Sequence, residues 1–140
     1  MDKYAKWFVV LSLIYLFIGS FLGLLIAVSS GEWKGLDYYL IPSHTHLQLI
    51  GWVSMLIFGV AYHILPRFTG RLIYSRKLAW LHFWVAQIGL IGMAVFFFLN
   101  RLQEGEWKKE LAVSGSLMFI SFCCFVYNML VTLLSKLEKV

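Results

Sequence analysis

Two histidines separated by a single residue stand at the start of a long apolar stretch, and a third lies near its other end. They are His44, His46 and His63, and a fourth, His82, follows in the next apolar stretch. A histidine that leaves water needs a hydrogen-bond partner, a metal ion or a place at the membrane interface. Imidazole is also a common metal ligand. The chemistry open to this chain therefore depends on what surrounds these four rings.

His44 and His46 cannot comfortably hold one metal ion from one helix. Helical residues two apart point about 200° apart, whereas ligands that share an ion are about four residues apart. Each ring should therefore face a different neighbour. A haem held here by two imidazoles would need a second chain, because no other histidine is predicted at this depth. Otherwise the second ligand is a methionine, such as Met93 or Met118, or the position on the iron is open.

His63 and His82 belong to the other end of the predicted helices. His63 lies about 28 Å beyond His44 along one helix, and the next helix returns so that His82 reaches a similar depth. We expect both to be interfacial residues, and His82 to be able to hydrogen-bond a neighbouring helix. For His44 and His46, composition leaves an interfacial role and a ligand role equally open.

Composition indicates an integral membrane protein. Hydrophobic residues make up 61% of the 140 residues and charged residues 14%, against about 45–50% and 25% in soluble domains. Uncharged runs of about 20 residues predict four membrane spans. They cover about residues 7–28, 43–65, 78–99 and 111–134. Short connections favour one all-α membrane domain over residues 1–140, an up-down-up-down four-helix bundle.

The distribution of Lys and Arg predicts the orientation of the bundle. With the amino terminus inside, the inner segments carry eight of the 12 basic residues and the outer loops carry four. The inner ones are Lys3, Lys6, Arg67, Arg71, Arg76, Lys77, Lys136 and Lys139, and the outer ones Lys34, Arg101, Lys108 and Lys109. This excess places both termini in the cytoplasm and the protein in the cytoplasmic, or inner, membrane. The net charge of +5 is then explained without a nucleic-acid partner.

Small residues predict close helix packing. Gly19 and Gly23 lie in the first span, and Gly51 and Gly59 in the second. Such residues let helices approach closely in lipid, within a chain or between chains. The two cysteines, Cys123 and Cys124, are expected to be packing residues. Without a CxxCH motif, no covalently attached c-type haem is expected.

The segment HTHLQLIGWVSMLIFGVAYHILPRFTGR resembles the tenth helix of the catalytic subunit of haem-copper oxidases, particularly C-type enzymes related to nitric oxide reductases. LHFWVAQIGLIGM is similar to the start of the eleventh. The resemblance covers about residues 44–95. It implies that His44 binds a high-spin haem and His46 a low-spin haem, while His63 and His82 match positions without a haem-ligand role.

This sequence also departs from that pattern. It has four spans against the family's twelve or more, and it lacks the segments that hold the copper ion, so copper and oxygen reduction by this chain alone are not expected. The twelve family helices form three four-helix arcs, and this chain resembles one arc. The resemblance thus implies a homo-oligomer, a trimer or dimer, in which haem b lies between His44 of one chain and His46 of the next. A different subunit could also supply the partner histidine.

The leading hypothesis is a membrane b-type haem protein for electron transfer, with a redox partner or quinol. An open iron position would instead favour binding of a diatomic gas. Two hypotheses of another class are an accessory or assembly subunit without cofactor, and copper handling by His44 and His46, which would require the helix to unwind there.

Overall fold

The computed structural model describes residues 1–29 and 35–134, and its regular structure is helical. Within these residues, four helices are long and apolar enough to cross a membrane. The prediction of an all-α protein with four helices of membrane-spanning length is thus confirmed. The elements are α1 (Lys3–Ser29), α2 (Leu36–His46), η1 (Leu47–Ser54), α3 (Met55–Phe68), α4 (Arg76–Leu102) and α5 (Lys108–Leu134). Elements α2, η1 and α3 follow one another without a break and form the second membrane helix.

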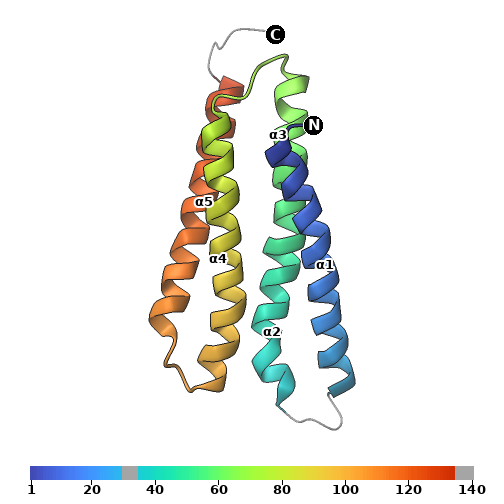
Figure 1. Cartoon of the computed structure of the whole chain (residues 1–140), viewed down its shortest axis with the longest axis vertical. Helices are drawn as coiled ribbons and strands as arrows, with labels where there is room; N and C mark the ends of the chain where they lie inside the picture. Colours follow the sequence, from blue (N-terminus) through green and yellow to red (C-terminus); the bar gives the residue numbers. More distant parts are fainter. Residues whose placement is uncertain (30–34, 135–140) are drawn as a thin grey trace.

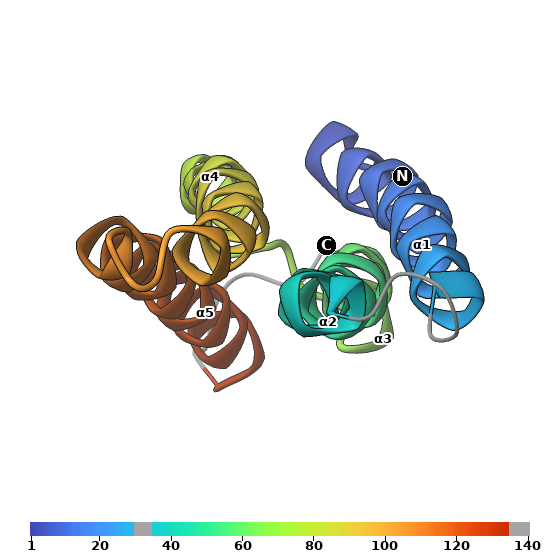
Figure 2. The ribbon, with the colours of Figure 1, turned by 90° about the horizontal axis from the view of Figure 1, so that it is seen from below.

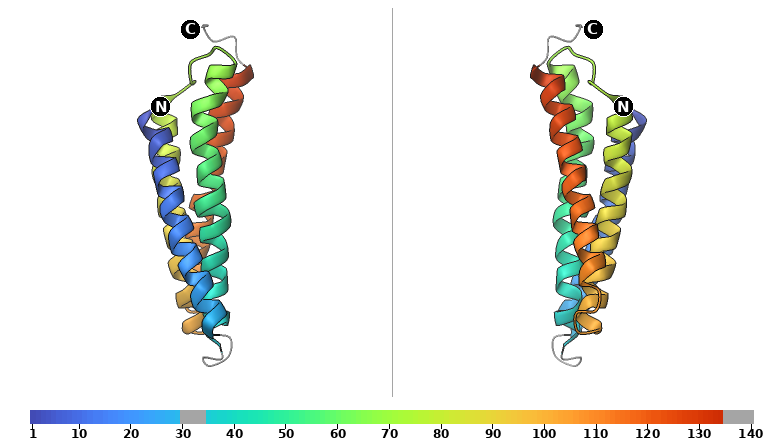
Figure 3. Two further views of the ribbon diagram at one scale, coloured as in Figure 1. Left: turned by 90° about the vertical axis from the view of Figure 1, so that its right-hand side faces the viewer. Right: turned by 90° about the vertical axis from the view of Figure 1, so that its left-hand side faces the viewer.

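The helices form an elongated bundle of two pairs (Figure 1). The rod made of α2, η1 and α3 lies between α1 on one side and the pair of α4 and α5 on the other (Figure 2). In the side views of Figure 3, α1 overlaps α4, and the rod of α2, η1 and α3 overlaps α5. We call the end that carries residues 69–75 the inner end and the opposite one the outer end, after the predicted sides of the membrane. That orientation stays a prediction, and Lys34, Lys136 and Lys139, which were counted for it, lie outside the described residues.

The second membrane helix begins earlier than the sequence predicts. The predicted span starts at about residue 43, but α2 begins at Leu36 and contains Pro42, a residue that usually marks a helix start. Proline lacks the N–H that would bond the carbonyl four residues earlier, here that of Tyr38. The Arg101 guanidinium donates to this carbonyl and lies 4.2 Å from the Tyr38 ring centre. A side chain of α4 thus replaces the lost helical bond, and His44 lies in the third turn of the helix.

Element η1 is a stretch of wider, π-type helix directly after His46. In a regular α-helix, Gly51 and Gly59 would point about 80° apart, and the wider turn reduces this angle. Both glycines face α1. A Cβ on Gly51 would lie 2.9 Å from the Tyr15 Cβ, and one on Gly59 would lie 2.9 Å from the Ala5 carbonyl oxygen. The close packing predicted from these glycines therefore occurs within one chain.

The segment after α3 is tied to α5 at the inner end. Gly70, with φ of +62°, adopts the left-handed conformation that ends the helix, and the Arg71 N–H bonds the Pro66 carbonyl at 2.9 Å. Asn128 of α5 then makes two bonds with the Ser75 backbone, at 3.0 and 3.1 Å. The connection from α3 to α4 is thereby fixed against the end of α5.

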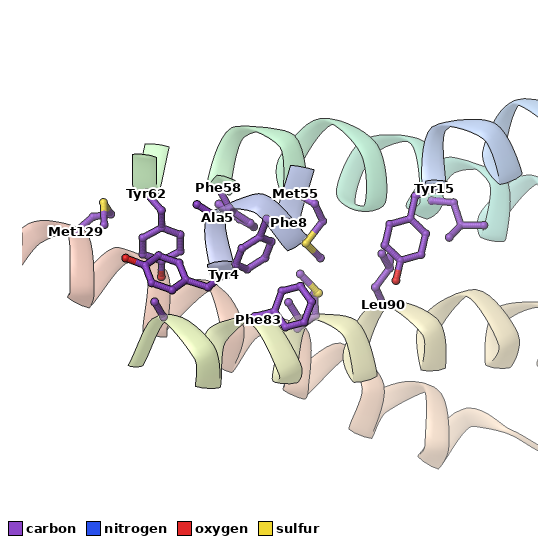
Figure 4. Close-up of a cluster of buried hydrophobic side chains, with 14 residues drawn as sticks. Tyr4, Ala5, Phe8, Tyr15, Met55, Phe58, Tyr62, Phe83, Leu90 and Met129 are labelled. Carbon is purple, nitrogen blue, oxygen red and sulfur yellow. The ribbon is translucent and has the colours of Figure 1, made fainter. Parts of the chain in front are cut away.

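Large aromatic side chains concentrate in the inner half of the core. Figure 4 shows Tyr4, Phe8, Phe58, Tyr62 and Phe83 gathered there, with Tyr15 and Leu90 set apart toward the outer half. These rings come from α1, α3 and α4, and many meet edge to face, for example Phe8 with Phe83 at 5.1 Å between centroids. Such packing adds to the dispersion energy that holds helices together in lipid.

Candidate functional site

His44 faces α1 and is held there by a backbone hydrogen bond. Its Nδ1 lies 2.8 Å from the carbonyl oxygen of Gly19. The ring also rests against Gly23, where an added Cβ would lie 2.9 Å from the His44 Cε1. Real side chains essentially never approach so closely, so the glycine provides the space that the imidazole occupies.

His46 faces α4 on the other side of the same helix. Its Nδ1 lies 2.8 Å from the carbonyl oxygen of Pro42, one turn earlier. Its ring packs on Phe97, with 4.5 Å between the ring centroids. Nearby, the Ser43 hydroxyl donates to the Ala94 carbonyl at 2.6 Å, which ties α2 to α4. The opposed directions predicted from helical geometry are thus confirmed by the different partners of the two rings.

The hydrogen bonds fix the protonation of both rings. A carbonyl oxygen only accepts hydrogen bonds, so Nδ1 of His44 and of His46 must each carry the proton. In a neutral imidazole the lone pair then resides on Nε2. Both rings are half-buried, and within the described residues no hydrogen bond to either Nε2 is found. Histidines that bind metals usually donate their second N–H to such a carbonyl, so this donor set fits axial ligation of a haem iron.

One chain does not bring the two rings to a common point. His44 contacts α1 and His46 contacts α4, with the helix itself between them. Of the two methionines considered as ligands, Met118 lies in α5, where its backbone packs on Gly89 of α4. Over the described ranges α5 does not contact α2. A second ligand for either histidine therefore has to come from Met93, from another group or from another chain.

His82 is a core residue, so the prediction of an interfacial position is wrong. Its side chain is 0% exposed, and Nδ1 lies 3.0 Å from the Tyr62 hydroxyl of α3, which is the expected bond to a neighbouring helix. Phe8, Phe58 and Phe125 surround it, with centroids 4.7–5.5 Å away. The prediction failed because the rings that enclose His82 lie on other helices. Its neighbours in the sequence, Trp80 and Trp84, do not indicate that these rings surround it.

His63 lies at the inner end of α3, half-buried, where Arg67 one turn later bonds its Nδ1 at 2.7 Å and also its carbonyl. The interfacial role of His63 stays a prediction. His63 and His82 are not brought near His44 or His46, because they belong to the other half of the bundle.

Three residues of the site were not identified as such from the sequence. Gly23 was noted only as a packing residue, Phe97 was one apolar residue in a run of them, and Arg101 was counted only as a charge. Of these three, only Arg101 had a signal in the sequence, which was Pro42. A proline inside a helix leaves the carbonyl four residues earlier without its helical donor, so another donor is needed.

Comparison with known proteins identifies the family of this chain. The model of the family described as cytochrome c and quinol oxidase polypeptide I matches residues 1–110. The chain belongs to this family. Its members include cytochrome c oxidase subunit 1 of Rhodobacter capsulatus, which is 37% identical over 76 residues, covering 54% of this chain and 14% of that protein.

Two further relatives extend the comparison. The cbb3-type cytochrome c oxidase subunit CcoN1 of Stutzerimonas stutzeri is 29% identical over 115 residues, covering 80% of this chain and 24% of that subunit. A cytochrome c oxidase subunit 1 homologue of Agrobacterium tumefaciens is 31% identical over 77 residues, which is 54% of this chain and 14% of that protein. The chain thus spans between about one seventh and one quarter of these relatives, and it is a multi-pass membrane protein like a segment of their subunit I.

Proposed function

We propose that this protein binds haem b in the cytoplasmic membrane and takes part in electron transfer, with His44 and His46 as iron ligands. Membership of an oxidase family supports the choice of haem. When bound between two imidazoles, the haem would supply one-electron transfer without an open coordination position. The protein's own residues would bind the iron, orient the two rings and keep lipid and water away from the site.

The observation that carries the proposal is the pair of Nδ1-to-carbonyl bonds. Gly19 holds the ring of His44 and Pro42 holds the ring of His46, each at 2.8 Å. Both histidines are therefore already in the tautomer that leaves Nε2 for a metal, and their orientation costs little further entropy on binding. An interfacial histidine in water would have no need of such a fixed donor bond.

The ligands would come from different chains. Because His44 and His46 face different helices, we infer a closed homo-oligomer, a trimer or dimer, in which His44 of one chain and His46 of the next approach the same iron. Closed symmetry would repeat this site at every interface. A redox partner or quinol would exchange electrons with the haem, and copper has no assigned role.

The test is the spectrum of the full chain purified in mild detergent with haem supplied. Pyridine extraction would identify the haem, and the mass in detergent would give the number of chains. We expect His44→Ala and His46→Ala each to lower bound haem about 10-fold or more, or to convert it to a high-spin form. His63→Ala is the matched control and should retain the spectrum of the unchanged protein. Circular dichroism would verify that all three variants are folded.

Carbon monoxide distinguishes the two haem functions. Reduced protein whose absorption bands do not move under carbon monoxide has both axial positions filled, as electron transfer requires. A shifted Soret band would indicate an open position and favour diatomic gas binding. Wild-type spectra in both the His44 and His46 variants, or protein that binds no haem, would defeat the proposal and favour an accessory subunit.

A further inference from the structure

A pocket of about 380 Å³ opens at the inner end of the bundle, opposite the end that carries His44. It lies between the start of α1, the end of α3 and the segment that leads into α4. Its lining combines cationic, aromatic and hydroxyl groups. The groups that bear on its chemistry are Asp2, Tyr4, Tyr62, Arg67, Arg71 and Arg76.

Positive charge dominates this pocket. Its lining includes three arginines, Arg67, Arg71 and Arg76, and one acidic residue, Asp2. Two of the arginines are held in position, since Arg67 bonds His63 at 2.7 Å and Arg71 donates to the Leu133 carbonyl of α5. Guanidinium groups bind phosphate oxygens through paired, charge-assisted hydrogen bonds. The pocket is therefore suited to an anion with several oxygen atoms.

A buried hydroxyl in the same pocket lacks a partner. Tyr4 is 3% exposed, and its hydroxyl has no hydrogen-bond partner among the described residues. The Asp2 carboxylate is near it without meeting the geometry of a hydrogen bond. Figure 4 shows this hydroxyl directed to the inner end, away from Phe8 and Phe83. Buried hydroxyls are nearly always satisfied, so the Tyr4 hydroxyl is suited to donate to an acceptor that enters the pocket.

The surface of α3 that faces away from this pocket is apolar. A groove of about 410 Å³ there is lined by Leu56, Ile57, Val60, Ala61, Ile64 and Leu65. These residues lie on the side of α3 opposite Tyr62 and Pro66, which line the basic pocket. The outward surface of the bundle next to its inner end is thus suited to lipid chains, and a phosphate bound in the pocket would lie at the depth of lipid headgroups.

We propose that the basic pocket binds the phosphate of an anionic phospholipid, whose acyl chains lie in the surrounding lipid. Basic pockets between membrane helices on the cytoplasmic side recognise such headgroups. Arg67 and Arg76 contribute charge, and the Tyr4 hydroxyl donates to a phosphate oxygen. The site is independent of the proposed haem function, because none of its residues contacts His44 or His46.

Native mass spectrometry of the full chain in neutral detergent tests this proposal. The probes are phosphatidylglycerol, phosphatidylcholine with the same acyl chains, and inorganic phosphate. We expect phosphatidylglycerol to bind at least about 10-fold more tightly than phosphatidylcholine. The double variant R67Q/R76Q should weaken phosphatidylglycerol binding about 10- to 30-fold. K108Q/K109Q, which removes the same charge from the outer end, should leave it unchanged.

Tyr4→Phe gives a second test that does not alter charge. It should weaken phosphatidylglycerol binding about 2- to 5-fold, whereas Tyr127→Phe, an exposed tyrosine on α5, should not. Equal binding of the two lipids, or an equal loss in R67Q/R76Q and K108Q/K109Q, would overturn the proposal. Inorganic phosphate that binds as tightly as phosphatidylglycerol would overturn the assignment to a lipid. The haem spectrum is expected to be the same in all these variants.

Discussion

The inner and outer halves of the bundle use the same residue, histidine, in opposite ways. In the inner half, His82 is enclosed by aromatic rings and bonded to the Tyr62 hydroxyl. In the outer half, His44 and His46 are half-buried and bonded to backbone carbonyls. A hydroxyl can donate or accept, so it leaves the tautomer of His82 open, whereas a carbonyl determines which nitrogen keeps the proton.

This difference separates a histidine that stabilises the fold from one prepared to bind a ligand. His82 fills a volume in the aromatic cluster and cross-links α3 to α4. His44 and His46 present an Nε2 with a lone pair at sites that remain accessible. Burial and the nature of the hydrogen-bond partner therefore distinguish the two kinds of histidine better than their spacing along the sequence.

The largest effect should come from removing an aromatic ring in the inner half. Phe8 is 0% exposed and contacts His82 and Phe58. Phe8→Ala should lower the free energy of unfolding by about 3–5 kcal/mol, because the cavity forfeits many packing contacts. Titration with sodium dodecyl sulfate in mixed micelles, followed by circular dichroism, would measure it. Phe17→Ala on the same helix, 76% exposed, should change it by less than about 0.5 kcal/mol. Equal losses would show that the inner half is not the stabilising region.

The next effect concerns the outer half and rests on the proposed haem function. Gly23→Ala places a Cβ where the His44 ring lies, so the ring must rotate. We expect haem affinity to fall about 10-fold, or about 1.4 kcal/mol, with the free energy of unfolding of the apoprotein nearly unchanged. Haem titration followed by absorption would measure the affinity. At Gly115 a Cβ meets nothing within 4 Å, so Gly115→Ala should bind haem normally. An unaltered spectrum and affinity in Gly23→Ala would count against His44 as a ligand.

A smaller effect is expected for the hydrogen bond of the inner half. Tyr62→Phe keeps the ring and removes the partner of the His82 Nδ1. Hydrogen bonds between membrane helices contribute about 0.6 kcal/mol on average, so the free energy of unfolding should fall by about 1 kcal/mol or less. The haem spectrum should not change, since Tyr62 lies in the other half. A changed spectrum would mean that the halves are coupled and would break the comparison.

A comparably small effect should follow loss of the Arg101 contact at the outer end. Arg101→Gln removes the donor to the Tyr38 carbonyl and the cation above the Tyr38 ring. For this exposed contact we expect about 0.5–1 kcal/mol, seen as faster hydrogen exchange in the first turns of α2. Lys109→Gln, an exposed outer residue, is the control. Unchanged exchange in Arg101→Gln would indicate that water satisfies the Tyr38 carbonyl as well as the guanidinium does.

Much of the fold could be predicted because apolar length and charge spacing act locally. Each predicted span lies within one of the four long helices. The start of the second helix could not be predicted, because Pro42 normally marks a helix start, and the donor that lets it lie inside a helix is some sixty residues away in Arg101. His82 was misplaced for the same reason, since three of the rings that enclose it come from other helices.

The sequence by itself determined the membrane-spanning helices, the close approach of helices at glycines and the opposed directions of His44 and His46. These follow from hydrophobicity and from the fixed rise and turn of a helix. Only the tertiary structure decided that His82 is enclosed and that Gly19 and Pro42 set the tautomers of His44 and His46. It alone also brought three arginines and Tyr4 together in the lining of one pocket. Those properties depend on which atoms of distant segments come within hydrogen-bonding distance, and no local pattern in the chain encodes that.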